Sequence, residues 1–156
     1  MQIENPYLWI TLATLGVVVA CVLFHYEGLR ALSRWVTADV LPARARIVSL
    51  IFGQLVLHVS EIWLFGLTNY LLAERNGFGS IIATMAQSHS DPAKPMILID
   101  YIYYSATVYS TLGFGDLIAT GPLRLLTGVE AVTGLVLITW SASFTFLEMQ
   151  RYWGRG

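Results

Sequence analysis

The stretch Tyr103–Asp116, YYSATVYSTLGFGD, decides the interpretation of this chain. It ends in the hexapeptide Thr111-Leu112-Gly113-Phe114-Gly115-Asp116. Glycine accepts backbone angles that other residues avoid, so Gly113 and Gly115 allow a backbone whose successive carbonyl groups point to one side. A row of carbonyl oxygens is what a dehydrated cation needs in place of its water. Long apolar segments lie on both sides of the hexapeptide.

The composition indicates a membrane protein. Of the 156 residues, 56% are hydrophobic and 12% are charged, and the mean hydropathy is +0.62. A soluble domain of this size could not bury so many apolar side chains in one core. The net charge of −1 and the lack of a Lys/Arg-rich run give no reason to expect a nucleic-acid partner. The single Cys21 excludes an intrachain disulfide and most thiolate metal sites.

Three segments are long enough to span a bilayer, which needs about 20 helical residues. They are Tyr7–Phe24, Ile47–Ala73 and Leu125–Leu147. The apolar segment Pro95–Thr111 is shorter, carries Asp100 and runs into glycines, so we interpret it as a re-entrant half-helix. The predicted fold is therefore an all-α membrane protein with three transmembrane helices plus a re-entrant helix.

Arginine placement predicts the orientation, because cytoplasmic loops collect Lys and Arg. The loop between the first two spans contains Arg30, Arg34, Arg44 and Arg46, and the tail contains Arg151 and Arg155. We therefore expect the N terminus and residues 74–123 outside, and the C terminus in the cytoplasm. The segment Val18–Cys21 resembles a lipoprotein cleavage box, but the first 29 residues contain no Lys or Arg. A retained span is the favoured interpretation.

The stretch Tyr103–Asp116 resembles the pore helix and selectivity filter of potassium channels, whose filters read Thr, apolar, Gly, Tyr or Phe, Gly, Asp. Such filters replace the hydration shell of K⁺ with backbone carbonyls. The resemblance covers about Ile47 to Trp153. A second Gly-Phe-Gly, Gly77–Gly79, lacks the preceding Thr and the trailing Asp, and we interpret it as a loop.

The apolar segments and the resemblance together predict a domain division, with the first span outside the family pattern. Residues 1–27 form an N-terminal transmembrane helix, residues 28–46 a cytoplasmic interfacial linker and residues 47–156 a pore domain. Within the pore domain we expect an outer helix at 47–73, an outer loop at 74–95, a pore helix at 96–110, a filter at 111–116 and an inner helix at 122–150. The linker segment Gly28–Asp39 has the pattern of a short interfacial helix, although a solvated linker fits equally well.

The resemblance also implies the function. Four chains would surround the ion, so we expect a homotetramer in the cell (inner) membrane that conducts K⁺ passively and is not an enzyme. The K⁺ sites would be the carbonyls of Thr111, Leu112, Gly113 and Phe114, with Gly115 completing the filter. We expect no cofactor besides permeant K⁺ and no tethered ligand-binding domain. A weakly selective monovalent cation channel is the alternative.

Several residues around the filter depart from the family pattern or add to it. Leu112 and Phe114 replace the commoner Val and Tyr, and Thr107 stands where some members have Glu. Tyr104 is expected to hydrogen-bond Asp116, as the family's aromatic residue does. Gly134 lies where members often have a flexible glycine. Below it, Trp140 and Phe144 could face the pore axis or pack against the outer helix.

Ionisable residues within spans are functional candidates, because they are costly there. Gln54, His58 and Glu61 fall on one helical face, and Glu130 lies at a depth that makes contact with Glu61 plausible. Two roles stay open: a pH-sensitive gating cluster, and a structural hydrogen-bond network. A remote alternative is a metal- or proton-handling protein that uses His58 and Glu61. We expect His25 near the inner face and His89 in the outer loop, away from His58.

Overall fold

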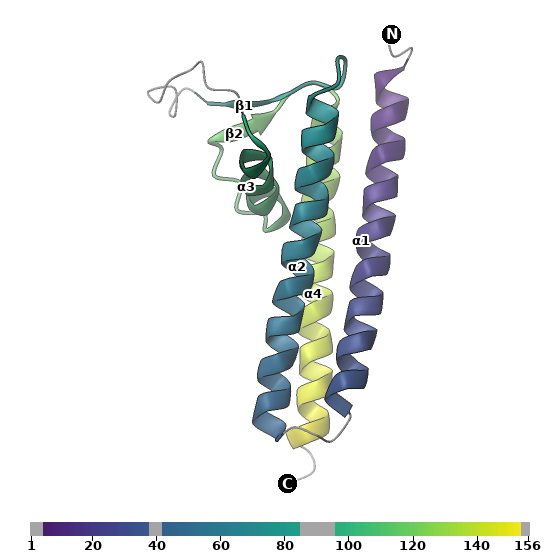
Figure 1. Cartoon of the computed structure of the whole chain (residues 1–156), viewed down its shortest axis with the longest axis vertical. Helices are drawn as coiled ribbons and strands as arrows, with labels where there is room; N and C mark the ends of the chain where they lie inside the picture. The colour runs from purple at the N-terminus through teal and green to yellow at the C-terminus, as the bar shows by residue number, and fades with distance from the viewer. Residues whose placement is uncertain (1–4, 38–41, 85–95, 154–156) are drawn as a thin grey trace.

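The computed structural model describes residues 5–37, 42–84 and 96–153 (Figure 1). Its elements are α1 (Pro6–Thr37), α2 (Ala43–Ala73), β1 (Ile81–Ala83), α3 (Leu98–Tyr109), β2 (Leu117–Ala119) and α4 (Leu123–Trp153). Three of these helices are long and apolar enough to cross a membrane, over Pro6–Trp35, Arg44–Ala73 and Leu123–Arg151. The structure confirms the predicted three spans and the short helix between the second and third.

The predicted linker at residues 28–46 is wrong for its first part, because α1 does not end near residue 27 but continues to Thr37. Packing against α2 explains the continuation. Leu29 is buried, and a Cβ on Gly28 would lie 2.4 Å from a methyl carbon of Leu57, so Gly28 lets α1 and α2 approach closely. Leu29 is therefore buried and Leu32 packs against Gly53 of α2. Residues 38–41 lie outside the described part.

The helices form a bundle with the short elements at one end. In Figure 1, α3 and the two strands lie to one side of the α2–α4 pair, and α1 lies on the other side. The N-terminal end of α1 is at the same end of the molecule as α3, whereas the C-terminal end of α4 is at the opposite end. The re-entrant segment and the start of the chain therefore share one end of the bundle.

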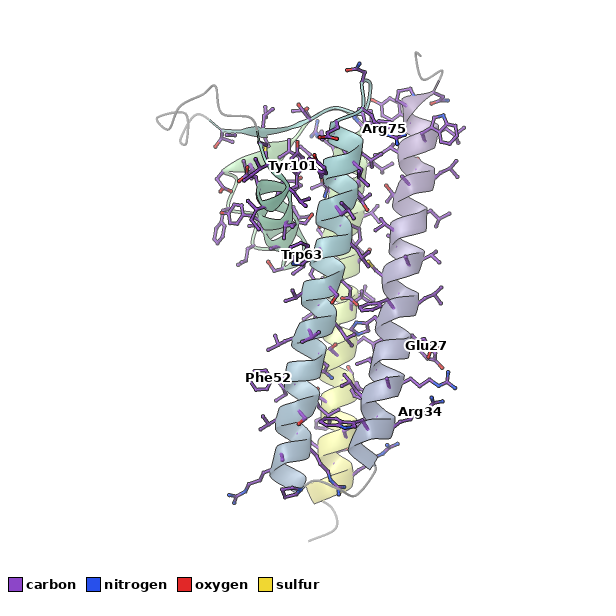
Figure 2. All side chains as sticks on the ribbon, in the orientation of Figure 1. Glu27, Arg34, Phe52, Trp63, Arg75 and Tyr101 are labelled. Carbon is purple, nitrogen blue, oxygen red and sulfur yellow. The ribbon has the colours of Figure 1, made fainter. Side chains whose placement is uncertain are left out.

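Apolar side chains cover much of the outer surface of the bundle. Phe52 and Trp63 project outward from α2 (Figure 2), with exposed fractions of 64% and 50%. Apolar side chains in such number are stable against lipid or against other protein chains, but not in water. The surface thus agrees with a multi-pass membrane protein.

A two-stranded antiparallel sheet joins the outer loop, which the sequence predicted only as loop, to the segment after the hexapeptide. Strand β1 pairs with β2 in the register Ile81↔Ala119, Ile82↔Ile118 and Ala83↔Leu117. The Thr84 N–H donates to the Asp116 carbonyl at 2.8 Å and extends the pairing to the end of the glycine-rich hexapeptide. The outer loop is therefore anchored to the backbone that follows the hexapeptide. Its residues 85–95 lie outside the described part.

Candidate ion-conduction site

Helix α3 leads directly into the hexapeptide and holds its first half. The Asp100 carboxylate accepts the Ile97 N–H at 2.9 Å and so caps the start of α3. Beyond the end of the helix, the Thr111 N–H donates to the Val108 carbonyl at 2.9 Å, and the Gly113 N–H donates to the Thr107 carbonyl at 3.0 Å. The backbone after α3 therefore folds back onto the last turn of the helix.

The backbone of the hexapeptide alternates in the sign of φ. Thr111, Gly113 and Gly115 have φ of +61°, +51° and +77°, whereas Leu112 and Phe114 between them are not in the positive region. The alternation agrees with the expected role of the two glycines. The positive φ of Thr111 was not foreseen, since a non-glycine residue held there costs ~1–3 kcal/mol. The sequence gives no signal for it.

The apolar side chains of the hexapeptide are uncovered within one chain. Leu112 and Phe114 have exposed fractions of 63% and 65%. Adding a Cβ at Gly113 or Gly115 would meet no atom within 4 Å. One chain therefore supplies a single carbonyl strand without the wall that would hold it.

Tyr103, and not Tyr104, bonds the carboxylate that follows the glycines, so that expectation is wrong. The Tyr103 hydroxyl donates to Asp116 Oδ2 at 2.8 Å, and the carboxylate beside it raises the pKa of Tyr103. Consecutive residues lie about 100° apart on a helix, so Tyr104 faces α4. Its hydroxyl lies 2.7 Å from Thr127 Oγ1.

Thr107 supports the hexapeptide with its backbone alone. Its carbonyl accepts the Gly113 N–H, while its buried hydroxyl donates to the Tyr104 carbonyl one turn earlier, at 2.8 Å. Here the threonine hydroxyl is used within α3, so the hydrogen bond from Tyr103 is the side-chain bond that holds Asp116 in the described structure.

Gly134 lets α4 pack directly on the end of α3. A Cβ at Gly134 would lie 2.1 Å from the Tyr109 carbonyl oxygen and 2.8 Å from its carbonyl carbon. No side chain fits in that space without movement of the backbone. The structure therefore gives Gly134 a packing role next to the hexapeptide, which the sequence comparison with flexible glycines did not indicate.

A family model described as an ion channel matches residues 47–151, more than half of the chain. The chain belongs to this ion-channel family. The matched module is the two-helix pore of the potassium-channel type, and it covers α2 to α4 but leaves α1 outside. Comparisons with curated proteins and with solved structures gave no match.

The channel contains a buried polar cluster in which His25 takes part, contrary to expectation. His25 Nδ1 lies 2.8 Å from Glu61 Oε1, and both side chains are fully buried. Its ring centroid lies 5.3 Å from that of His58. Ending the first span at Phe24 placed His25 at the membrane surface, but α1 continues for three more turns and His25 lies in its interior. His89 lies outside the described residues.

Tyr109 and Ser141 complete this cluster, and neither was singled out from the sequence. The Tyr109 hydroxyl donates to Glu61 Oε2 and lies 2.9 Å from His58 Nδ1. Ser141 Oγ lies 3.0 Å from His58 Nε2 and 3.2 Å from His25 Nε2. The cluster thus joins all four helices, and Tyr109 brings it within two residues of Thr111.

Gln54 and Glu130 belong to other contacts. Gln54 Nε2 donates to the Ser141 carbonyl at 3.3 Å, and Thr145 donates to Gln54 Oε1 at 2.8 Å. The buried Glu130 accepts the amide of Asn69 at 3.1 Å, and that amide also donates to Ser105 Oγ at 3.0 Å. Among the described residues no hydrogen bond joins Glu61 to Glu130, so the proposed contact between these carboxyl groups is not formed.

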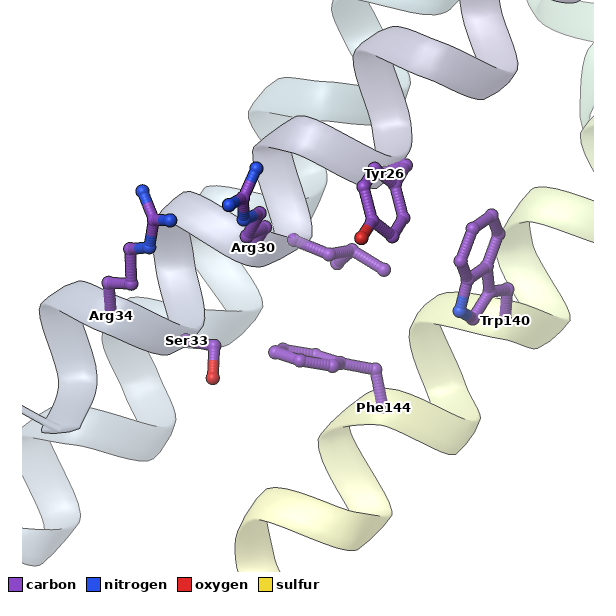
Figure 3. Close-up of a pocket in the computed structure, with 7 residues that line it drawn as sticks. Tyr26, Arg30, Ser33, Arg34, Trp140 and Phe144 are labelled. Atoms are coloured by element: carbon purple, nitrogen blue, oxygen red, sulfur yellow. The ribbon is translucent and has the colours of Figure 1, made fainter.

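Trp140 and Phe144 both face α1. Their rings line a pocket with Tyr26, Arg30 and other α1 residues (Figure 3), and the Trp140 ring centroid lies 5.4 Å from that of His25. The sequence left a pore-facing orientation or packing against the outer helix for these two residues. Neither option included α1, because its position could not be inferred from the pore-domain pattern.

Proposed function

We propose that the chain forms a homotetrameric, potassium-selective channel of the cell membrane, the inner membrane in a bacterial cell. Potassium would cross on the symmetry axis, bound by the carbonyls of Thr111, Leu112, Gly113 and Phe114 from each chain. The alternation of φ along this strand carries the proposal, because only such a backbone turns successive carbonyls to one side. The ring of carbonyls would replace the water around a dehydrated K⁺.

The exposed side chains of the filter strand support four-fold assembly. One strand cannot surround an ion, and a closed symmetric ring supplies the other strands. In such a ring, Leu112 and Phe114 would pack against neighbouring chains and hold the carbonyls in place. In a single chain these two apolar side chains would remain exposed, which is unfavourable in water.

Two further observations support the orientation and the ion class. Five of the nine basic residues lie toward the helix ends opposite α3 (Figure 1): Arg30 and Arg34 in α1, Arg44 and Arg46 in α2, and Arg151 in α4. This favours a cytoplasmic C terminus and an outward filter. The negative end of the α3 dipole lies at Tyr109, just before the filter, where it would stabilise a cation.

The test is flux through purified protein in liposomes, with K⁺ or Na⁺ as the permeant ion. Gly113→Asp should abolish selective K⁺ flux. Gly77→Asp is the matched control, since both glycines have positive φ and open space at Cβ and both precede Phe-Gly. Native mass spectrometry should give four chains per particle. Equal flux of K⁺ and Na⁺ in the wild type would support the weakly selective alternative, for which the absent hydroxyl at Phe114 is the motivating feature.

A further inference from the structure

The cluster of His25, His58, Glu61, Tyr109 and Ser141 has a chemical peculiarity that ion conduction does not explain. In both histidines, Nδ1 faces Glu61 and Nε2 faces Ser141. Their Nδ1 atoms face the two oxygens of Glu61, at 2.8 Å and 3.2 Å. Their Nε2 atoms both face Ser141 Oγ. Each imidazole therefore lies between one carboxylate and one shared hydroxyl.

The hydrogens available in this cluster do not satisfy its contacts. Six close contacts join the five side chains. With neutral imidazoles and an ionised carboxylate there are only four hydrogens, one from each histidine and one each from Tyr109 and Ser141. At least one contact must then bring the lone pairs of two acceptor atoms together without a hydrogen between them, which is unfavourable in a buried site. A cation placed among these atoms removes the conflict.

We propose that His25, His58 and Glu61 bind a transition-metal ion such as Zn²⁺. Two imidazole nitrogens and one carboxylate are a common zinc ligand set, with bonds of ~2.0–2.2 Å. Tetrahedral ligands at that distance lie about 3.3 Å apart. One ligand atom from each of the three residues lies within 4.8 Å of the other two. His25 Nδ1 lies 2.8 Å from Oε1 of Glu61, about 0.5 Å less than the tetrahedral value, and His58 Nδ1 lies 3.2 Å from the other oxygen, Oε2.

The surrounding groups suit the metal-bound form. With both Nδ1 atoms on the metal, each Nε2 carries its hydrogen toward Ser141 Oγ, whose two lone pairs accept them. Metal-bound histidines usually donate their other N–H to an acceptor in this way. Tyr109 donates to Glu61 Oε2, which leaves Oε1 as the carboxylate ligand. The fourth position of a tetrahedral site would then be open for water.

A pocket on the α1–α4 side lies next to a residue that covers the cluster. The Trp140 ring packs against the His25 ring and lines this pocket together with Tyr26 (Figure 3). The His58 side chain also keeps an exposed fraction of 15%. The bound metal would fasten α1, which is outside the matched pore module, to α2 and through Tyr109 to the filter helix.

The test is metal binding to the full-length protein after treatment with a chelator. Equilibrium dialysis with ZnCl₂ and elemental analysis should give one ion per chain, and Zn²⁺ should raise the midpoint of thermal unfolding. Co²⁺ should give the intense visible absorption of a four-coordinate site. His25→Gln and Glu61→Gln should lose binding, whereas Ser141→Ala, which removes only the acceptor, should weaken it ~10–100-fold.

His89→Ala is the matched control, because it removes the third histidine of the chain and no proposed ligand. It should bind as the wild type does. The proposal is overturned by a wild type that retains no Zn²⁺, which would leave an extra proton as the cation of the cluster. It is equally overturned by binding that survives His25→Gln and Glu61→Gln or disappears with His89→Ala. These measurements need no ion flux, so they are independent of the proposed potassium selectivity.

Discussion

Replacement of Gly134 by alanine should damage the proposed filter through the packing of α4 on α3. The new Cβ would lie 2.1 Å from the Tyr109 carbonyl oxygen, whereas an ordinary contact begins at 3.4 Å. The two backbones would have to separate by about 1.3 Å, the difference between these distances. Tyr109 is two residues before Thr111, so the displacement reaches the first carbonyl of the filter.

The free energies can be compared in order of magnitude. Overpacking of a tight contact costs ~1–3 kcal/mol, and a clash with backbone, which cannot rotate away, belongs at the upper end. Alanine in place of glycine inside a helix gains ~1 kcal/mol. The net destabilisation is about 2 kcal/mol, which in a chain of this size lowers the unfolding midpoint by roughly 4–8 °C.

Gly128→Ala is the matched control on the same helix, because its Cβ would meet nothing within 4 Å. This variant should gain the free energy that alanine contributes over glycine in a helix, without the clash, and its unfolding midpoint should rise. Both variants would be compared by tryptophan fluorescence during heating and by K⁺ flux in liposomes. Gly134→Ala should unfold earlier than the wild type and lose most of its flux.

A hinge role for Gly134 leads to a different result. Alanine would then stiffen α4, lower the flux and raise the unfolding midpoint as Gly128→Ala does. An unfolding midpoint of Gly134→Ala at or above that of the wild type would therefore refute the packing argument, whatever happens to the flux.

Three further outcomes follow from the site. Tyr103→Phe, which removes the hydroxyl that donates to the filter carboxylate, should shorten the time that single channels stay conducting, measured in planar bilayers. Gly79→Ala should unfold several degrees below Gly77→Ala, because both have positive φ but only the Gly79 Cβ meets a backbone oxygen, at 2.1 Å. Glu130→Leu removes one of the two acceptors of the buried Asn69 amide and should cost ~1–3 kcal/mol of stability, whereas Glu130→Gln, which keeps an acceptor, should cost less when both are followed by thermal unfolding.

The predictable part of this structure is the part that depends on periodicity and on local backbone chemistry. Span lengths follow from runs of apolar residues, and the positive φ at Gly113 and Gly115 follows from what glycine alone tolerates. The positive φ at Thr111 does not, because its cause is the return of the strand onto the Thr107 carbonyl. A threonine at position 111 gives no indication in the sequence that this contact forms.

The errors at Tyr103 and His25 have a different origin, which is the placement of one helix relative to another. The sequence alone does not distinguish which of Tyr103 and Tyr104 bonds Asp116, because that depends on the rotation of α3 about its axis. His25 was assigned to the membrane surface because the apolar run stops at Phe24, but the depth of a residue depends on how far the helix continues and on its partners. Helix α1 continues to Thr37 because α2 offers it a surface.

That surface shows that α1 is an integral part of the channel and not a separate anchor. Gly28 of α1 makes space for Leu57, and Gly53 of α2 makes space for Leu32, each with a hypothetical Cβ only 2.4 Å from a leucine methyl carbon. Each helix therefore packs one leucine side chain against a glycine of the other helix. A helix that only faced lipid would need neither these glycines nor a buried imidazole, since a buried polar group is costly unless it is paired. The polar partner of His25 is Glu61, and Glu61 also accepts the hydroxyl of Tyr109 at the end of α3. Through this carboxylate, a helix outside the shared pore module is linked to the helix that precedes the proposed filter.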